Sequence, residues 1–156
     1  MKYKIIGAFM ICLLSVTTKM YASSPKAGDD FNIVVNKFIN SIVTSDYKEL
    51  RSVLDEKLRF KISHLNSVMI FKKSTVVEDI KWRNGRQQPF KPSYVVLAQS
   101  DAVTIVQVDF QYENTVMQNF IFLEKDQDNE WKIKQVYELF KTIDNIKTKD
   151  SIAVSK

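Results

Sequence analysis

Apolar residues early in the chain recur at every third or fourth position, the spacing of a helix with one buried face. They are Phe31, Val34, Val35, Phe38, Ile39 and Ile42. The Asp29-Asp30 pair just before them is suited to accept hydrogen bonds from the free N–H groups of a first helical turn. Asp46, with Glu49 three residues later, gives a similar start signal for a second, short helix.

Further along, the apolar period changes to two, which is typical of strands. The alternation predicts strands at residues 58–62, 93–99, 102–112, 116–123 and 131–140, and residues 68–71 form another short apolar run. A third helix over 75–82, capped by Ser74, interrupts them, and a polar loop follows at 83–92. Because helices precede a run of antiparallel strands with short turns, the sequence predicts an α+β fold with helices on one face of a curved sheet.

The last predicted strand changes its apolar phase part-way along. Its apolar residues stand first at odd positions, Trp131 and Ile133, and then at even positions, Val136 and Phe140. One extra residue near Lys134-Gln135, a β-bulge, would re-aim the later side chains and bring both halves onto one face.

The first 22 residues have the pattern of a cleavable signal peptide. Lys2 and Lys4 precede an apolar run of about a dozen residues, which is shorter than the roughly 20 that a membrane-spanning helix needs. Small residues follow, and cleavage is predicted after Ala22. A retained membrane anchor is the alternative, and the length of the run disfavours it. Cys12 lies inside the run after a bulky residue, which argues against a lipid attachment site.

Removal of residues 1–22 would leave a linker at 23–28, a domain at 29–140 and a polar tail at 141–156. The removed segment holds three lysines and no acid, so most of the formal net charge of +5 belongs to it. The mature domain is therefore a poor match for nucleic acid, whose binding depends on neutralising many phosphates. It also lacks cysteine, so in the oxidising compartment that export implies it would fold on its hydrophobic core alone. We predict a periplasmic or secreted protein without a permanent membrane span.

Several segments of the predicted domain share residues with one known family. They are Asp46-Tyr47 with Leu50, residues 53–60, 71–74 and 108–112, and Trp131-Lys132-Ile133 with Val136 and Phe140. Together they resemble the NTF2-like (nuclear transport factor 2-like) superfamily, most closely its exported bacterial lumazine-binding group. The resemblance covers about Asp29 to Phe140. It implies a cone with a hydrophobic pocket between helices and sheet, and homodimers through the sheet. It implies no particular chemistry, because this fold serves both enzymes and binding proteins.

Aromatic side chains on the strands are the candidate ligand-binding residues: Tyr94, Phe110, Tyr112 and Trp131. Each offers an apolar body, and Tyr and Trp add a polar tip, as the walls of small-molecule pockets often do. Packing in the core is the alternative role for all four and is the commoner one for strand aromatics.

Asp109 is the carboxylate embedded in the most apolar strand, and it could serve as a general base, as in steroid-isomerase relatives of this fold. Alternation along a strand weakens that reading. Asp109 shares its face with Gln107 and Gln111, whereas the opposite face is continuously apolar. Only the apolar face suits the helices, so we expect Asp109 on the outer, wetter side of the sheet.

Other chemistry finds little support, and we predict no catalytic residue, metal or cofactor. His64 is the only histidine, and Ser63 beside it would point to the other face of a strand. One histidine without mature cysteine is too few for a zinc site. Residues 126–130 begin like an EF-hand loop but lack its glycine and its closing glutamate, which favours a solvated turn. Three scattered glycines cannot form a phosphate-binding loop.

Three functions remain open at this point. The first is a non-catalytic exported domain that binds a small apolar or aromatic ligand or a protein partner. The second is an enzyme of the isomerase, dehydratase or cyclase kind that uses a pocket carboxylate. The third is a structural dimer or interaction module of the cell envelope. A buried acid with a raised pKa that faces a pocket would favour the enzyme, and a filled cone would favour the third.

Overall fold

The computed structural model describes residues 30–64 and 66–143. Helix α1 (Phe31–Thr44) is followed by α2 (Tyr47–Val53), β1 (Leu54–His64), β2 (Ser67–Phe71), α3 (Lys73–Trp82), β3 (Lys91–Gln99), β4 (Val103–Tyr112), β5 (Thr115–Lys125) and β6 (Trp131–Thr142). The predicted signal peptide, the linker and most of the polar tail lie outside the described residues. Across the part of the chain described, no helix combines the length and apolar character that crossing a bilayer requires.

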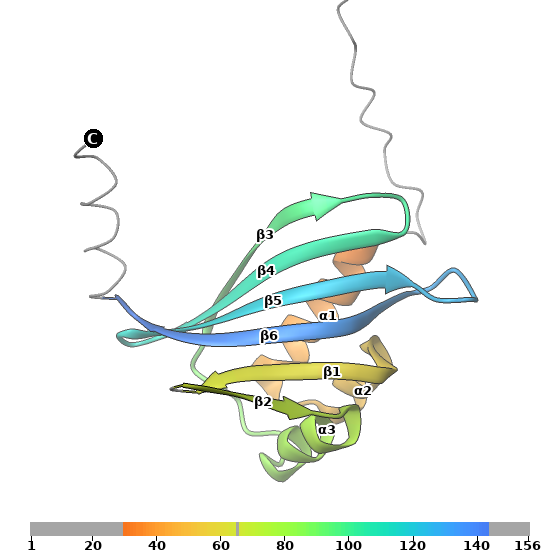
Figure 1. The fold of residues 1–156 in the computed structure, drawn as a ribbon. Helices are drawn as coiled ribbons and strands as arrows, with labels where there is room; N and C mark the ends of the chain where they lie inside the picture. Colours follow the sequence, from red (N-terminus) through yellow and green to blue (C-terminus); the bar gives the residue numbers. More distant parts are fainter. Residues whose placement is uncertain (1–29, 65, 144–156) are drawn as a thin grey trace, which may run out of the picture.

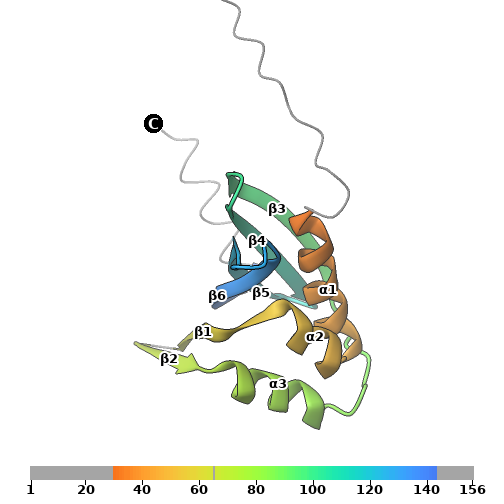
Figure 2. The same cartoon turned by 90° about the vertical axis from the view of Figure 1, so that its right-hand side faces the viewer.

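The strands form one curved, unclosed sheet in the order β2-β1-β6-β5-β4-β3, with the three helices packed on one side (Figure 1). Figure 2 shows α1 beside β3 and β4, and α3 below β1 and β2, so that the helices cover the hollow side of the sheet. The α+β prediction is confirmed. One detail differs, because β1 pairs with β6 in parallel while every other neighbouring pair is antiparallel. The chain runs from α2 directly into β1.

Side-chain caps begin the first two helices, as the sequence predicts. Asp30 accepts a hydrogen bond from the backbone N–H of Asn32, and Asp46 accepts from those of Lys48 and Glu49. The third helix is different. It begins at Lys73, so Ser74 lies inside it rather than capping it, and Lys72 at the cap position makes no side-chain hydrogen bond. The ammonium group of Lys73 instead ties this helix to β1, by donating to the carbonyl of Leu54 at 2.7 Å.

The predicted stripe of α1 packs into the core. Phe31, Val35, Phe38 and Ile42 are buried, and Val34 is half-buried at the edge of the stripe. Ring contacts join the helix to the sheet: the centroids of Phe38 and Phe110 lie 6.3 Å apart. Alternate residues of β4, from Thr104 to Phe110, complete the inner face. The apolar face of the sheet therefore meets the helices, as expected.

The predicted β-bulge in the last strand is confirmed. Phe122 of β5 pairs with Gln135, and its neighbour Leu123 pairs with Ile133, so Lys134 is the extra residue between them. The bulge keeps buried residues on the inner face along β6, first Ile133 and then Val136. It thereby also turns Glu138 toward the helices.

The segment between α3 and β3 is held against the end of α1. Ser45, in a left-handed conformation at the end of α1 (φ 56°), donates through its hydroxyl to the carbonyl of Arg86 at 2.7 Å. The backbone N–H of Gln88 donates to the carbonyl of Val43, also at 2.7 Å. These tertiary hydrogen bonds give the polar loop a defined path and bring Phe90 over the inner face of the sheet.

Candidate functional site

A cavity of about 420 Å³ lies inside the cone, between α1, α3 and the inner face of the sheet. Its walls are mainly apolar, with contributions from Ile42, Phe60, Ile62, Phe71, Phe90 and Met117. Its polar groups come from α3 and β6: Thr75, Asp79, Arg83 and Glu138. The volume and this sparse set of polar groups are typical of small-molecule sites. The pocket that the NTF2-like resemblance implies is thus present.

Glu138 is the buried acid of this cavity. It lies on the inner face of β6 and is 8% exposed. Burial raises the pKa of its carboxyl group to about 7, Arg83 lowers that pKa, and Asp79 raises it further. The side chain makes no hydrogen bond or ion pair with any other residue that the structure describes. Such a group changes charge near neutral pH and can either donate or accept a proton there.

Asp79 and Arg83 form an ion pair at the rim of the cavity. One turn apart on α3, they meet with the guanidinium of Arg83 2.7 Å from the carboxylate of Asp79. Both side chains are partly exposed, so solvent screens the pair. Because the guanidinium is engaged with Asp79, Arg83 acts on Glu138 through its field and not by direct contact.

Asn119 stands beside Glu138 on the sheet. It pairs directly with Glu138 across β5 and β6, so both side chains are on the inner face. Asn119 is buried, and its Oδ1 has no hydrogen-bond partner within the described residues. Its Nδ2 donates to the carbonyl of Met117 at 3.4 Å. An orphaned acceptor therefore neighbours the one buried acid of the cavity.

The four predicted aromatic residues lie in or beside the hydrophobic core, and none of them is among the residues that line the cavity. Phe110 is fully buried and contacts Phe38 and Phe90. Trp131 is buried against Phe31, with ring centroids 6.1 Å apart. The other two are partly exposed: the Tyr94 hydroxyl donates to Asn32, and Tyr112 packs edge-on against Phe90.

Phe90 connects two of these residues to the cavity. It lines the cavity itself and contacts both Phe110 and Tyr112, which form a layer behind it. Tyr94 and Trp131 belong to other parts of the cone, beside the first turn of α1. Direct ligand contact by the four aromatic residues remains a prediction.

Asp109 lies on the outer face of the sheet, as expected from strand alternation. It is half-buried between the buried residues Val108 and Phe110, whose side chains point inward. Gln107 donates to its Oδ2 at 2.9 Å, and its Oδ1 has no partner within the described residues. Asp109 therefore does not face the cavity, and the acid that does is Glu138.

Sequence reasoning missed Glu138, although a signal for it was present. Once the bulge puts Val136 and Phe140 on the inner face, Glu138 between them must share that face. An acid flanked by apolar positions of the same phase is the pattern that identifies it.

The remaining chemical candidates are His64 and the turn at residues 126–130. His64 is the last residue of β1. Asp126 accepts from the backbone N–H groups of Asp128 and Glu130, so 126–130 is a hairpin turn closed by its own carboxylate. Over residues 30–64 and 66–143, no three His, Cys, Asp or Glu side chains come together in a way that could hold a metal ion.

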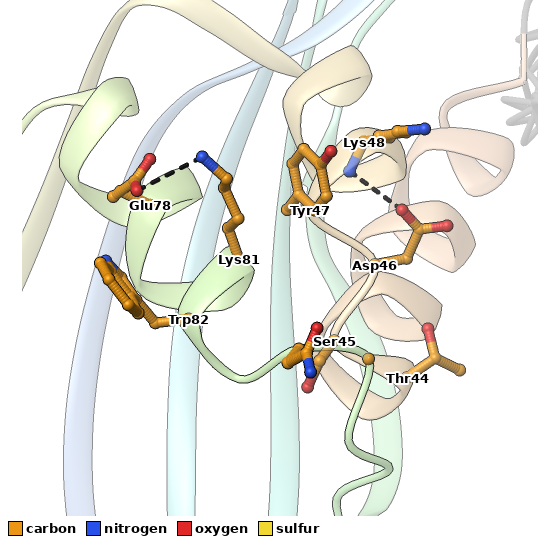
Figure 3. Close-up of a pocket in the computed structure, with 10 residues that line it drawn as sticks. Thr44, Ser45, Asp46, Tyr47, Lys48, Glu78, Lys81 and Trp82 are labelled. Atoms are coloured by element: carbon orange, nitrogen blue, oxygen red, sulfur yellow. Dashed lines mark hydrogen bonds and ion pairs between the residues drawn. The ribbon is translucent and has the colours of Figure 1, made fainter.

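A wider hollow lies outside the cone, where the start of α2 meets the end of α3 (Figure 3). Tyr47 and Lys48 border it on one side, and Lys81 and Trp82 on the other, with Trp82 80% exposed. It is open to solvent and lined mainly by polar side chains, among them the Glu78–Lys81 ion pair. It buries no titratable group. We therefore place the candidate site in the cone.

No protein family model and no curated protein matches this sequence. Solved structures do match its fold. An NTF2-like protein of unknown function from Methylobacillus flagellatus aligns with a TM-score of 0.59 at 14% identity, over 76% of this chain and 98% of that one. A protein from Rhodospirillum rubrum, described as NTF2-like and of unknown function in nutrient uptake, aligns at 0.55 and 19% identity, over 71% and 98%.

A ketosteroid isomerase-like protein from Erwinia carotovora atroseptica aligns with a TM-score of 0.55 at 8% identity, over 70% of this chain and 92% of that one. At identities this low the likeness is one of fold alone. The chain thus has the NTF2-like fold, and its function must be argued from its own cavity.

Proposed function

We propose that this protein is an exported NTF2-like domain that binds a small, mainly apolar ligand in the cone cavity, with Glu138 as the polar group that orients it. The observation that carries the proposal is a cavity of about 420 Å³ with apolar walls and a single deeply buried carboxyl group. Burying an ionisable group without a partner costs stability. A ligand that engages Glu138 would offset that cost.

The experiment is a binding titration with a neutral aromatic probe, naphthalenemethanol, followed by NMR chemical shifts. Val76 lines the cavity, so Val76→Phe should fill part of it and weaken probe binding at least about tenfold, or about 1.4 kcal/mol. Ile33→Phe is the matched control, because Ile33 is exposed on α1 and is not among the residues that line the cavity. Equal binding by both variants would place the ligand elsewhere. Native mass spectrometry of protein purified from its own compartment would then seek the natural ligand.

Export is the second part of the proposal, and it rests on the basic start, the short apolar run and the small residues that follow. We expect the N-terminus of the mature protein, determined by mass spectrometry after expression from its full-length gene, to lie near Ser23. An intact Met1, or a lipid on Cys12, would contradict this expectation.

A second candidate function is proton transfer by Glu138, favoured by its raised pKa of about 7. A carboxylate in an apolar cavity is also suited to remove a proton from carbon. Nitrobenzisoxazole tests this without knowledge of the substrate. A base takes the ring C–H proton, the N–O bond breaks, and coloured cyanonitrophenolate forms. If this protein transfers protons through Glu138, it should accelerate the reaction with a pH midpoint near 7, and the Glu138→Gln variant should lose that activity. A rate equal to that of Glu138→Gln would favour the binding protein.

A further inference from the structure

The charges that line the cone cavity leave one acid unpaired. Three lining residues are ionisable, and two of them, Asp79 and Arg83, pair with each other at the rim. The third, Glu138, lies deeper, on the sheet. When its carboxyl is ionised, the cavity therefore carries a net negative charge in apolar surroundings, where it interacts strongly with any cation that enters.

The lysines of β1 and β6 closest to Glu138 in sequence or pairing point away from it. On β1, Ile62 pairs with Glu138, while the adjacent Lys61 points to the outer face and donates to the hydroxyl of Tyr137. On β6, Lys141 donates to Gln118, which also belongs to the outer face. Apart from Arg83, no described lysine or arginine lines the cavity.

The two protonation states of Glu138 require different hydrogen-bond partners. The neutral acid carries a proton, and the Oδ1 of Asn119, which pairs with Glu138 across the strands, is an acceptor without a partner among the described residues. The ionised acid needs donors, and no described residue donates a hydrogen bond to it. Because Arg83 is engaged with Asp79, a donor with a positive charge would have to come from the ligand.

From this arrangement we propose that the cone cavity selects an apolar molecule carrying one positively charged nitrogen, and that Glu138 is its counter-ion. The inference rests on the proposed ligand-binding function and specifies the chemical class of the ligand. In the empty cavity, burial favours the protonated form of Glu138. The cationic ligand replaces that proton, and the apolar walls surround the rest of the molecule.

Two probes with the same ring system test this proposal: naphthylmethylamine, which is protonated at neutral pH, and naphthalenemethanol, which is uncharged. Near pH 8 the amine should bind at least about tenfold more tightly than the alcohol, as measured by calorimetry. In Glu138→Gln this preference should disappear while the alcohol keeps its affinity within about twofold. Asp109→Asn is the matched control on the outer face and should change neither affinity.

The pH dependence provides a second readout that needs no variant. Because the amine requires ionised Glu138, its affinity should rise from about pH 5.5 to about pH 8, whereas that of the alcohol should stay flat. Histidine side chains ordinarily change charge in the same range. The sequence has one histidine, so His64→Gln is the control and should retain the rise.

Each other outcome of these titrations counts against the proposal in a distinguishable way. Equal affinities for the two probes at all pH values would overturn the cation preference and leave the binding function intact. Tighter binding of the alcohol at low pH would show that Glu138 acts as a donor to a neutral ligand instead. If neither probe binds, the proposed binding function itself fails.

Discussion

Glu138 combines features that seldom occur together in a purely structural residue. It is buried on the inner face of β6, it borders a cavity, and the acceptor beside it on Asn119 has no partner in the described residues. A glutamine or a leucine at this position would pack without the cost of burying an acid. The cost is explained if the carboxyl group contacts a ligand in the cavity.

The raised pKa of Glu138 predicts how stability should change with pH. The folded protein holds this proton up to about pH 7, whereas the unfolded chain releases it near the ordinary value of 4.5. Between these values the native state binds more protons, so stability should fall as pH rises and level off above about 7. The total loss from this group is of order 3 kcal/mol at most.

Chemical denaturation near pH 5 and near pH 8 checks this prediction. Glu138→Gln should lose the downward slope and be more stable than the wild type at the higher pH. Glu124→Gln, at an exposed position of β5, is the matched control and should keep the slope. An unchanged slope in Glu138→Gln would contradict the raised pKa.

At the scale of elements, α1 covers the apolar inner face of the sheet. Phe38 is buried against Phe110, so Phe38→Ala should destabilise the fold by about 3–5 kcal/mol, the usual cost of truncating a large core residue. Ile33→Ala on the exposed side of the same helix should cost less than about 0.5 kcal/mol. Urea denaturation of both variants gives the comparison. A loss below about 1 kcal/mol for Phe38→Ala would mean that the stripe does not carry the core.

The bulge at Lys134 is the element that aims Glu138 into the cavity. Deletion of Lys134 removes the extra residue, so regular alternation after Ile133 would still place Val136 and Glu138 on the inner face. We therefore expect the deletion variant to keep cooperative unfolding in thermal denaturation. Lys134 also pairs with Asp55 at 2.5 Å, so Lys134→Ala is the control that removes only the ion pair. It should cost about 1 kcal/mol or less. A deletion variant that no longer unfolds cooperatively would contradict the assignment of Lys134 as the extra residue.

Periodicity predicts the elements of this fold well, because each buries one face. The helix stripe from Phe31, the capping role of Asp46 and the bulge near Lys134 all follow from the pattern of apolar and polar positions. The parallel pairing of β1 with β6 does not, since it joins segments far apart in sequence. The predicted start of α3 at residue 75 is also wrong. The helix begins at Lys73, which is anchored by a tertiary contact that no local signal reveals.

The site was harder to predict than the fold. A cavity is a space between elements, and its position depends on how α3 and the loop after it close the cone. Aromatic strand residues such as Phe110 satisfied the chemical criteria for a pocket wall, yet this one is covered by Phe38 and Phe90. Glu138 could be found only by following the phase of β6 through the bulge.

For the whole molecule, the outer face of the sheet is the surface on which we expect a second copy. On the edge strand β3, all four residues from Tyr94 to Leu97 are exposed although apolar, and Val95 is 51% exposed on the outer face. Between Ala98 and Glu124 the chain has no lysine or arginine, so two copies of the β4–β5 region can meet without positive repulsion. The opposite end of the face, on β1, carries Arg59 and Lys61.

We therefore predict a homodimer through the β3–β4–β5 side of the sheet, to be measured by sedimentation equilibrium of residues 23–156. Val95→Lys would bury a charge without a partner in such an interface and should weaken dimerisation at least about tenfold. Val68→Lys is the matched control, since Val68 is 59% exposed at the opposite edge, on β2, and should leave the dimer intact. A monomeric wild type would refute the dimer. Equal weakening by both lysines would show that the interface covers the whole sheet, and weakening by Val68→Lys alone would place it at the β2 edge.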